Sequence, residues 1–260
     1  MTAFFLAFVA LILAALPAPP VESLPHNATA DYQLGGAYEP APGVDVLTRD
    51  RAEKPATGLY NICYVNAFQT QPGELRWWKA HHPGLLLRSA NGDLVRDPDW
   101  PDEVLLDIRT EAKRRQLSGI EGAWLKGCAE SGYQAVEPDN LDSWTRSDGL
   151  LTRRMAIAFA RTLISSAHGS GLAIGQKNLA ELDGRRLGFD FAVTEECEVH
   201  RECAMYLRNF GGHVIEIEYT DNGRAAFRRA CSRRAQQIAV LLGDRDLVTP
   251  NHHDHVYEAC

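Results

Sequence analysis

The chain has 260 residues, 45% of them hydrophobic and 23% charged, which matches an ordinary globular protein with a large core. Its formal net charge of -7 argues against a nucleic-acid partner, because such a partner requires a basic face on the protein. The same charge would suit a neutral or cationic substrate, although solubility alone is enough to explain it.

The N-terminal segment has the pattern of an export signal. Residues 1–15 form a nearly continuous apolar run, and residues 16–20 are rich in proline. This pattern is typical of a secretory signal peptide, and the run is short for a membrane-spanning helix. An uncleaved anchor is the alternative, because no lysine or arginine precedes the run. We therefore assign residues 1–25 to a signal peptide and residues 26–260 to one secreted domain, without stable membrane association after cleavage.

Six cysteines follow this segment, and an even count behind an export signal favours disulfides. Two of them are close enough in sequence to close a small loop, and two others would tie down the C-terminus. The pairings that we favour on this basis, the last one by elimination, are Cys197 with Cys203, Cys231 with Cys260, and Cys63 with Cys128. Since six cysteines allow many other pairings, this connectivity is a hypothesis.

Short apolar, β-branched segments alternate with longer amphipathic ones along the rest of the chain. The strand-like segments are residues 44–47, 59–65, 104–108, 134–137, 172–175, 189–194, 214–217 and 238–242. Helical candidates between them include residues 110–126, 150–168, 198–210 and 223–234. Strands that alternate with helices predict a parallel sheet, and this number of units indicates a single-domain α/β fold, the (β/α)8 TIM barrel.

An open, doubly wound sheet is the rival α/β architecture. No G-x-G-x-x-G sequence follows a first strand, which removes the commonest nucleotide-binding form of that fold. Residues 69–102 are rich in proline, glycine and tryptophan, and they predict a long insertion before the strand expected at 104–108. Asn91-Gly92 within this insertion indicates a hairpin turn.

Polar side chains stand at nearly every predicted strand end. In a parallel barrel these ends meet at one face, where functional residues collect. The residues concerned are Tyr64, Asp107, Arg109, Glu137, Asp139, Asn140, Asp142, Lys177, Asn178, Glu195, Glu196, Glu218 and Tyr219. A purely structural barrel has no need of this coincidence, so we expect a cleft rich in carboxylates.

Asp139 and Glu195 are our first choice for catalysis in this cleft. Glycosidic cleavage requires one carboxyl group that protonates the leaving oxygen and a second that stabilises the oxocarbenium-like transition state. The ends of the predicted fourth and sixth strands would place two such groups across a sugar ring. Glu137 and Asp139 share one side of their strand if it stays extended, and Pro138 favours that conformation.

Each of these residues also has a structural explanation when taken alone. Asp139 could form an Asx-turn or a helix cap, Glu195 could be a solvated loop charge, and Arg109 could be the buried partner of Asp107. Their co-occurrence favours the functional explanation. The histidine-rich segment 252–255 could bind a metal, but we expect a disordered end there. We therefore predict neither a metal site nor a cofactor.

The strand ends taken together resemble the endo-α-1,4-polygalactosaminidases, glycoside hydrolase family 114. The short sequences that carry the resemblance are E-P-D-N-x-D at 137–142, Q-K-N at 176–178 and E-x-C at 195–197. The resemblance implies a (β/α)8 barrel, secretion and hydrolysis of α-1,4-linked galactosamine polymers. It also implies an acidic pair that maps to Asp139 and Glu195, with Glu196 ranked second. Departures after residue 65, before Asp107 and in 69–102 concern loop shape and hence the exact substrate.

We therefore expect a secreted, monomeric glycoside hydrolase whose partner is a polysaccharide, with the other polar strand-end residues binding the substrate. One alternative is a catalytically inactive carbohydrate-binding barrel, and another is a glycosidase that acts on a different exopolysaccharide. A de-N-acetylase would require a cluster of histidine and aspartate metal ligands at the strand ends, and the sequence has none there.

Overall fold

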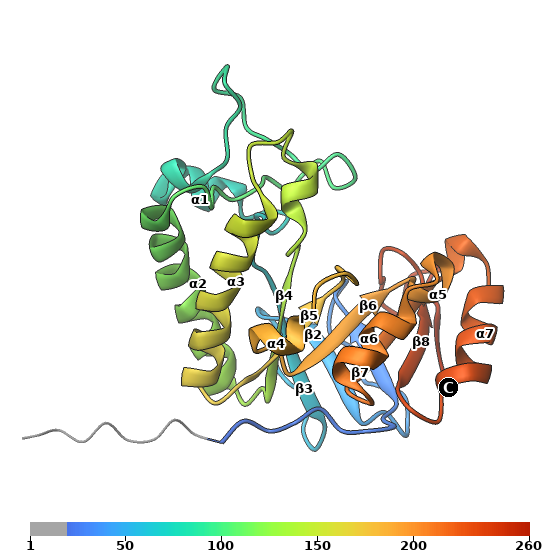
Figure 1. Cartoon of the computed structure of the whole chain (residues 1–260). Coiled ribbons are helices and arrows are strands. Elements are labelled where there is room, and N and C mark those ends of the chain that lie inside the picture. The colour runs from blue at the N-terminus through green and yellow to red at the C-terminus, as the bar shows by residue number, and fades with distance from the viewer. Residues whose placement is uncertain (1–19) are drawn as a thin grey trace, which may run out of the picture.

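The computed structural model describes residues 20–260, which form one nine-stranded sheet (Figure 1). The strands follow one another in chain order. They are β1 (Ala30–Gln33), β2 (Val46–Asp50), β3 (Tyr60–Asn66), β4 (Ala135–Asp139), β5 (Ala173–Lys177), β6 (Phe191–Glu195), β7 (Val214–Tyr219), β8 (Ala239–Gly243) and β9 (Tyr257–Ala259). Neighbours from β1 to β8 are parallel, and β9 runs antiparallel to β8.

The sheet curves until its two edges approach each other. β1 contacts both β8 and β9, and the hydroxyl of Tyr257 in β9 donates to the carbonyl of Ala30 in β1 at 3.1 Å. The predicted TIM-type fold is therefore confirmed as a nearly closed barrel of mostly parallel strands.

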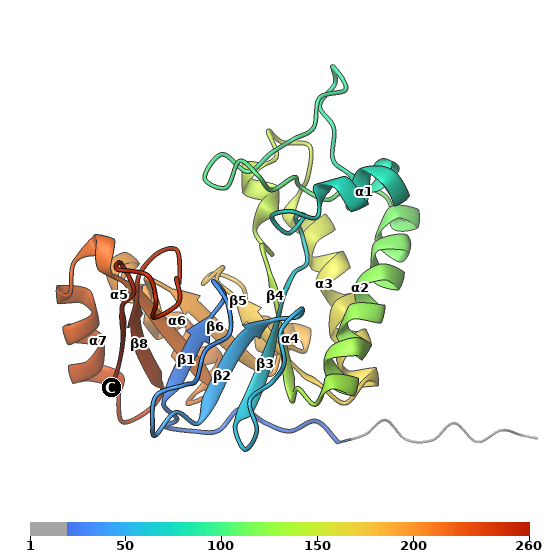
Figure 2. The ribbon, with the colours of Figure 1, turned by 180° about the vertical axis from the view of Figure 1, so that it is seen from behind.

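Helices or 3-10 turns follow each strand from β3 to β7, whereas in the described residues β8 leads to β9 without a helix. The α-helices are α1 (Leu75–His81), α2 (Glu111–Ser131), α3 (Arg153–Gly169), α4 (Gly184–Leu187), α5 (Cys197–His200), α6 (Cys203–Phe210) and α7 (Ala225–Arg234). Short 3-10 turns are η1 (Pro83–Leu85), η2 (Ser143–Arg146) and η3 (Thr220–Asn222). Within residues 20–260, the connections from β1 to β2 and from β2 to β3 contain no helix, so Figure 2 shows these three strands uncovered. The first two units thus depart from a regular (β/α)8 barrel.

Two helices show how local sequence sets their limits. Thr110 caps α2, because its side chain accepts from the amide of Lys113 at 3.2 Å, and Gly132 ends this helix at φ 96°. The single helix predicted at 198–210 is wrong in its continuity. Arg201 adopts φ 62°, a left-handed conformation that interrupts a helix, so α5 and α6 are separate.

The barrel strand predicted at residues 104–108 is also wrong. Val104, Leu105 and Leu106 are fully buried, but they form isolated antiparallel bridges with the insertion. An apolar run indicates burial without indicating which backbone pairs with it. The sequence reading missed two strands, β1, in which Asp31 and Gln33 interrupt the apolar pattern, and the short β9. Before β4, one extra and one missing strand cancel, so β4 and β6 keep their predicted ranks.

The predicted hairpin in the insertion is confirmed. Arg88 and Leu94 pair antiparallel, and the amide of Gly92, which has φ 89°, donates to the carbonyl of Ser89 at 3.1 Å. This hairpin belongs to the lobe that stands above the barrel in Figure 1, next to α1 and the upper ends of α2 and α3.

All three proposed cysteine pairings are present as disulfides. They join Cys63 in β3 to Cys128 in α2, Cys197 in α5 to Cys203 in α6, and Cys231 in α7 to Cys260 after β9. The second bridge lies directly after β6, and the third joins the end of β9 to α7, which packs against β8.

The expected signal peptide lies mostly at residues 1–19, outside the described residues. The next few residues run under the amino ends of the strands (Figure 2). Leu24 is only 3% exposed, its carbonyl lies 2.9 Å from Nδ1 of His213, and the carbonyl of Glu22 accepts from the hydroxyl of Tyr60 at 2.9 Å. Residues 22–24 therefore contribute to the packing of the barrel. In residues 20–260, no helix has both the length and the apolarity needed to cross a membrane.

Candidate active site

The two-residue period of the strands brings the polar strand ends together. Ala135, Phe191 and other apolar residues fill the barrel interior, with Glu137 and Asp139 next along β4 and Val193 and Glu195 next along β6. Along each of these strands, the inward-facing side chains therefore begin with an apolar one and end with a polar one at the carboxyl end of the strand.

Gly175 in β5 makes room for this arrangement. A Cβ atom at this position would lie 2.6 Å from the ring of Phe191, so only glycine allows the ring to fill the barrel between β5 and β6. Lys177 is two residues further along and points to the same face. Its ammonium group consequently emerges above an apolar layer.

A cavity of about 380 Å³ opens at this end of the barrel, within the range of small-molecule sites. Strand-end residues form its floor and the insertion forms one wall. The loop between β8 and β9 forms the opposite wall. Among the residues predicted for the site, those that line the cavity are Tyr64, Asp139, Asn140, Asp142, Lys177, Asn178, Glu195 and Tyr219.

Lys177 lies at the centre of the cavity floor and is 3% exposed. Its Nζ atom lies 3.1 Å from Oε1 of Glu137, 3.5 Å from Oδ1 of Asp139 and 3.4 Å from Oε2 of Glu195. The hydroxyl of Tyr32 is 3.2 Å from the same nitrogen and donates to Glu137. One buried ammonium group is therefore the shared cationic partner of three carboxyl groups.

Asp139 and Glu195 are bound in similar ways. The hydroxyl of Tyr64 donates to Oδ2 of Asp139 at 2.8 Å, and the amide of Asn140 donates to Oδ1 at 2.7 Å. The hydroxyl of Tyr219 donates to Oε1 of Glu195, and the side-chain amide of Asn178 donates to Oε2 at 2.8 Å. Each carboxylate thus receives a phenol on one oxygen and an amide on the other. This orients both groups.

Burial and the neighbouring charges shift the pKa values of three groups in the floor. Burial alone would lower the pKa of Lys177, but Asp139, Glu195 and Glu137 hold the lysine pKa well above its ordinary value. Burial alone would raise the pKa of Glu195, yet Lys177 and the donors from Tyr219 and Asn178 hold it below its ordinary value. Glu137 lies deepest, and burial raises its pKa to about 7 despite the charge of Lys177.

The insertion and the residue directly after it contribute six cavity residues that are absent from the predicted site, namely Gln71, Pro72, Asp97, Asp99, Trp100 and Glu103. Asp97 is buried, accepts from Gln69 at 2.7 Å, and receives the amide of Trp100 at 3.3 Å. Glu103 accepts from Asn66 at 2.8 Å, and burial raises its pKa to about 7. Trp100 is 47% exposed. The acidic run around a tryptophan at 97–103 is the sequence signal that could have indicated this wall.

Asp107 and Arg109 do not line the cavity. Asp107 is buried and accepts from Nε of Arg109 at 2.9 Å, with Lys113 as a second cationic partner. Because residues 104–108 pair with the insertion, this ion-pair cluster lies at the start of α2 and not at a barrel strand end.

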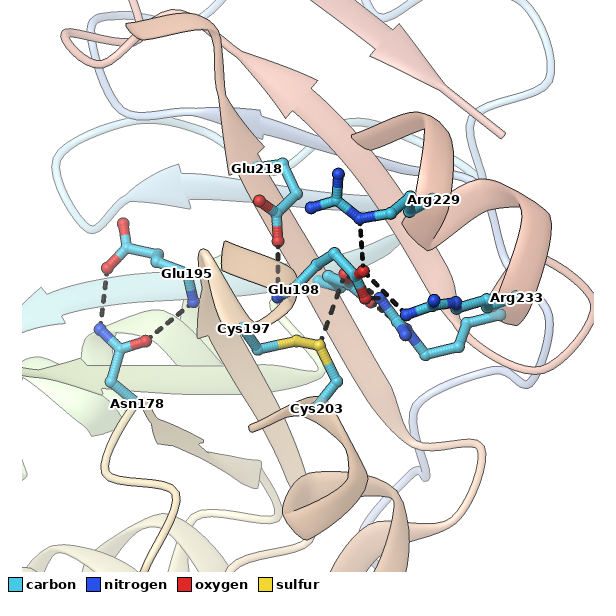
Figure 3. Close-up of a disulfide and its surroundings, with 10 residues drawn as sticks. Asn178, Glu195, Cys197, Glu198, Cys203, Glu218, Arg229 and Arg233 are labelled. Carbon is cyan, nitrogen blue, oxygen red and sulfur yellow. Dashed lines mark hydrogen bonds and ion pairs between the residues drawn. A yellow bond between two sulfur atoms is a disulfide. The ribbon is translucent and has the colours of Figure 1, made fainter. Parts of the chain in front are cut away.

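Glu218, in β7, also lies outside the cavity, on the face of β6 and β7 that is turned away from it (Figure 3). It accepts from the amide of Glu198 at 3.0 Å. Glu198 in turn pairs with Arg229, Arg233 and Arg234 on α7, and the Cys197–Cys203 disulfide lies beside this network. Figure 3 shows Glu195 and Asn178 on the other side of β6, so the end of β6 faces the cavity and the residues from Cys197 onward face the network.

Glu196 does not line the cavity either and adopts the left-handed conformation at φ 59°. Its carboxylate pairs with Arg245, which follows β8 and lies at the cavity wall.

Within residues 20–260, two groups of side chains have the spacing of metal ligands. In the first, Cys197 and Cys203 are joined as a disulfide and cannot bind as thiolates next to Glu216. The second is His252, His253 and Asp254, all of which are exposed. The disordered end predicted for this segment is wrong, because Nδ1 of His255 contacts the carbonyl of Val248 at 2.6 Å and β9 follows. Neither group adjoins the cavity.

The fold and the position of the cavity define a TIM-barrel enzyme whose polar site stands at the carboxyl ends of the parallel strands. The sequence model of glycoside-hydrolase family GH114 matches residues 12–260. The chain therefore belongs to family GH114 and is a glycoside hydrolase, which confirms the resemblance noted from the strand ends.

Solved structures share the fold. Ega3 from Aspergillus fumigatus, crystallised in complex with galactosamine, has a TM-score of 0.71 at 22% identity, over 94% of this chain and 100% of that chain. The glycoside hydrolase domain of PelA from Pseudomonas aeruginosa has a TM-score of 0.56 at 17% identity, over 88% and 97% of the two chains. TtGalA, an alpha-galactosidase from Thermus thermophilus crystallised with stachyose, has a TM-score of 0.51 at 12% identity, over 90% and 64%. A comparison with curated protein sequences gave no match.

Proposed function

We propose that this glycoside hydrolase is secreted and cleaves an α-1,4-linked, galactosamine-containing polysaccharide by means of Asp139 and Glu195. One observation carries the proposal. The two carboxylates come from different strands and contact the same buried ammonium group of Lys177 at the floor of an open cavity. That arrangement supplies the two carboxyl groups that glycosidic cleavage requires.

In this proposal the carboxylates act on opposite sides of the scissile bond. One of them donates a proton to the leaving oxygen, and the other stabilises the positive charge that develops at the sugar ring. Tyr64 and Tyr219 fix the orientation of Asp139 and Glu195, respectively. Lys177 balances part of the negative charge of the floor, which lets the two carboxyl groups stand close together.

The charge of the cavity wall supports a substrate with free amino groups. Five acidic side chains line the walls outside the proposed catalytic pair, and they are Asp97, Asp99, Glu103, Asp142 and Asp246. Arg146 and Arg245 are the only arginines among the lining residues, and both are engaged in ion pairs. Galactosamine carries one ammonium group per residue, so an acidic wall attracts it at low ionic strength. The galactosamine in the crystals of Ega3 agrees with this substrate class.

The proposal is tested with isosteric variants. Asp139→Asn and Glu195→Gln should each abolish the release of reducing ends from α-1,4-linked polygalactosamine, because an amide can neither donate the proton nor stabilise the charge. Glu258→Gln is the matched control, since Glu258 lies in an exposed ion pair with Arg224. Thermal unfolding followed by circular dichroism verifies that all variants fold. If Asp139→Asn or Glu195→Gln cleaves as fast as the wild type, that residue has been wrongly assigned.

A carbohydrate-binding barrel without activity is distinguished in the same experiment. Isothermal titration calorimetry that shows tight binding of the polymer, with no reducing ends released by the wild type, would replace the enzymatic proposal.

The proposed secretion rests on the apolar N-terminal run and on the disulfides. Three disulfides fit an oxidising compartment, because cytosolic reductants keep most thiols reduced. Mass spectrometry of the protein recovered from culture medium tests the proposal. We expect a cleaved N-terminus and all six cysteines in disulfides, whereas protein retained in the cells with the full N-terminus would contradict secretion.

A further inference from the structure

Arg245 connects three strand-end loops beside the cavity. It belongs to the loop between β8 and β9. Its Nε and Nη2 atoms donate to the two oxygens of Asp221 in η3, each at 2.9 Å. Its Nη2 and Nη1 atoms also donate to the two oxygens of Glu196 after β6, at 2.6 and 3.2 Å. The planar guanidinium group is therefore fixed by a carboxylate from each of two neighbouring loops.

The same guanidinium group covers the ring of Tyr219. Its Cζ atom lies 4.2 Å from the ring centroid, within the range of a cation–π contact. Tyr219 is 2% exposed, and its hydroxyl donates to Oε1 of Glu195. Arg245 therefore reaches Glu195 through a single aromatic ring, without contacting its carboxylate directly.

The simpler explanation is that Arg245 only links the three loops. Exposed ion pairs of this kind are common and contribute little to stability, so they need no further role. Two observations favour more than that. The guanidinium group is held on both of its edges while its face rests on Tyr219, which fixes the plane of the ring. In addition, Glu196 adopts an unfavourable left-handed backbone conformation at φ 59°, and in this conformation it pairs with Arg245.

We propose that Arg245 is a positioning residue that fixes the ring of Tyr219 and thereby the hydrogen bond from its hydroxyl to Glu195 during hydrolysis. The inference rests on the proposed role of Glu195. Without Arg245 the phenol is free to tilt, and Glu195 loses part of a donor that favours its ionised form. The limb of the pH–rate profile that reports Glu195 then moves to higher pH.

Several other groups also face Glu195 and act on the same limb. They are Lys177 from β5, Asp139 and Glu137 from β4, Tyr32 from β1 and Asn178 after β5. Arg245 contacts none of these groups directly, so its removal leaves their contribution in place. The charges of Glu196 and Asp221, which its removal leaves unpaired, act also in the Tyr219→Phe background, so a double-mutant cycle separates them from the effect transmitted by Tyr219.

A double-mutant cycle tests the inference. Arg245→Met, Tyr219→Phe and the double variant are assayed for kcat and KM on α-1,4-linked galactosamine oligomers across the pH range. We expect each single variant to lower kcat about tenfold or more, which is about 1.4 kcal/mol, and to move the same limb upward. In the Tyr219→Phe background, Arg245→Met should lower kcat by less than about twofold, because the transmitting hydroxyl is already absent.

Two further variants serve as controls. Arg224→Met removes an exposed arginine that pairs only with Glu258 in β9, and it should leave kcat and the pH profile unchanged. Arg245→Lys keeps the charge but not the planar fork, so it should behave like Arg245→Met.

Fully multiplicative effects of Arg245→Met and Tyr219→Phe would overturn the inference, as would full activity in Arg245→Lys or a change confined to KM. In each of these cases the wild type still hydrolyses the oligomers. A wild type that hydrolyses nothing would contradict the proposed function instead, so the two failures are distinguishable.

Discussion

Lys177 and Glu137 form an ion pair beneath the cavity floor, with 3.1 Å between Nζ and Oε1 and with both side chains buried. The same ammonium group contacts Asp139 and Glu195. Three negative charges around one positive charge are unfavourable in a buried site. Burial raises the pKa of Glu137 to about 7, so below that pH the carboxyl group of Glu137 carries a proton. The ammonium charge is then left for the two carboxylates that face the cavity.

Removal of the ammonium group should destabilise the fold. Lys177→Met leaves Glu137, Asp139 and Glu195 without their shared cation, and breaking a buried pair in this way typically costs about 3–5 kcal/mol. Guanidinium denaturation measures the free energy of unfolding. The control is Lys126→Met, which breaks only an exposed pair with Glu130 and should change stability by less than about 0.5 kcal/mol. Equal stability of the two variants would show that Lys177 is not the countercharge of the floor.

Glu218 should make stability depend on pH. Burial, with added repulsion from Glu216, raises the pKa of Glu218 to about 7, compared with 4.5 for a free glutamate. The folded state therefore retains a proton that the unfolded state releases above pH 4.5. The stabilisation from this proton is complete below about pH 4.5 and is lost as pH rises to about 7.

Glu218→Gln isolates this contribution. Glutamine cannot release a proton and still accepts from the amide of Glu198, so the variant should lose less stability between pH 4.5 and 7. The difference amounts to about 1.4 kcal/mol for each unit of pKa shift. Urea unfolding at several pH values tests it. Parallel stability curves for the two proteins would show that the pKa of Glu218 is the same in the folded and unfolded states.

Trp100 should bind a sugar ring at the cavity wall. It is 47% exposed, lines the cavity, and its backbone is held by the buried Asp97. A stacked ring is worth about 0.5–1.5 kcal/mol, so Trp100→Ala should raise KM for long oligomers about two- to tenfold. Trp77→Ala is the control, since Trp77 is 38% exposed on α1 and does not line the cavity. A similar rise in KM for both variants would indicate a general effect of lost tryptophan.

The reaction should retain the configuration at the anomeric carbon. Oδ1 of Asp139 and Oε2 of Glu195 lie 3.5 and 3.4 Å from one nitrogen, so their separation cannot exceed these two distances laid end to end, a limit that covers the whole retaining range and only the lower edge of the inverting range. Retaining glycosidases hold their carboxyl groups about 5–5.5 Å apart, whereas inverting ones need about 6.5–9.5 Å to admit a water. Proton NMR of the first product should show the α-anomer. An initial β-product would require a wider separation in the substrate complex.

The residues before the barrel should contribute to its stability. A chain that starts at residue 26 loses the buried Leu24 and the carbonyl of Glu22 that accepts from Tyr60. Burial of one leucine stabilises a protein by about 1.5–3 kcal/mol, so this chain should unfold at a lower temperature than one that starts at residue 20. Leu24→Ala in the longer chain should reproduce most of the loss. Identical melting temperatures would show that residues 20–25 are dispensable.

The sequence by itself determined that Asp139, Lys177 and Glu195 share the open end of the barrel. Alternation within each strand puts Asp139, Lys177 and Glu195 on the same face as the apolar residues below them, and parallel strands bring their ends to one edge. This alternation is a local property of each strand, so it can be predicted without knowing which strands are its neighbours in the sheet.

Only the tertiary structure decided the walls of the cavity and the fate of residues 104–108. Trp100, Glu103 and Arg245 come from irregular loops, in which no period fixes the direction of a side chain. The apolar run before Asp107 was recognisable as buried, but the same run can pair with a barrel strand or with an insertion. The choice depends on contacts between segments far apart in the chain, and for this reason Asp107 and Arg109 lie at the start of α2 and not in the cavity.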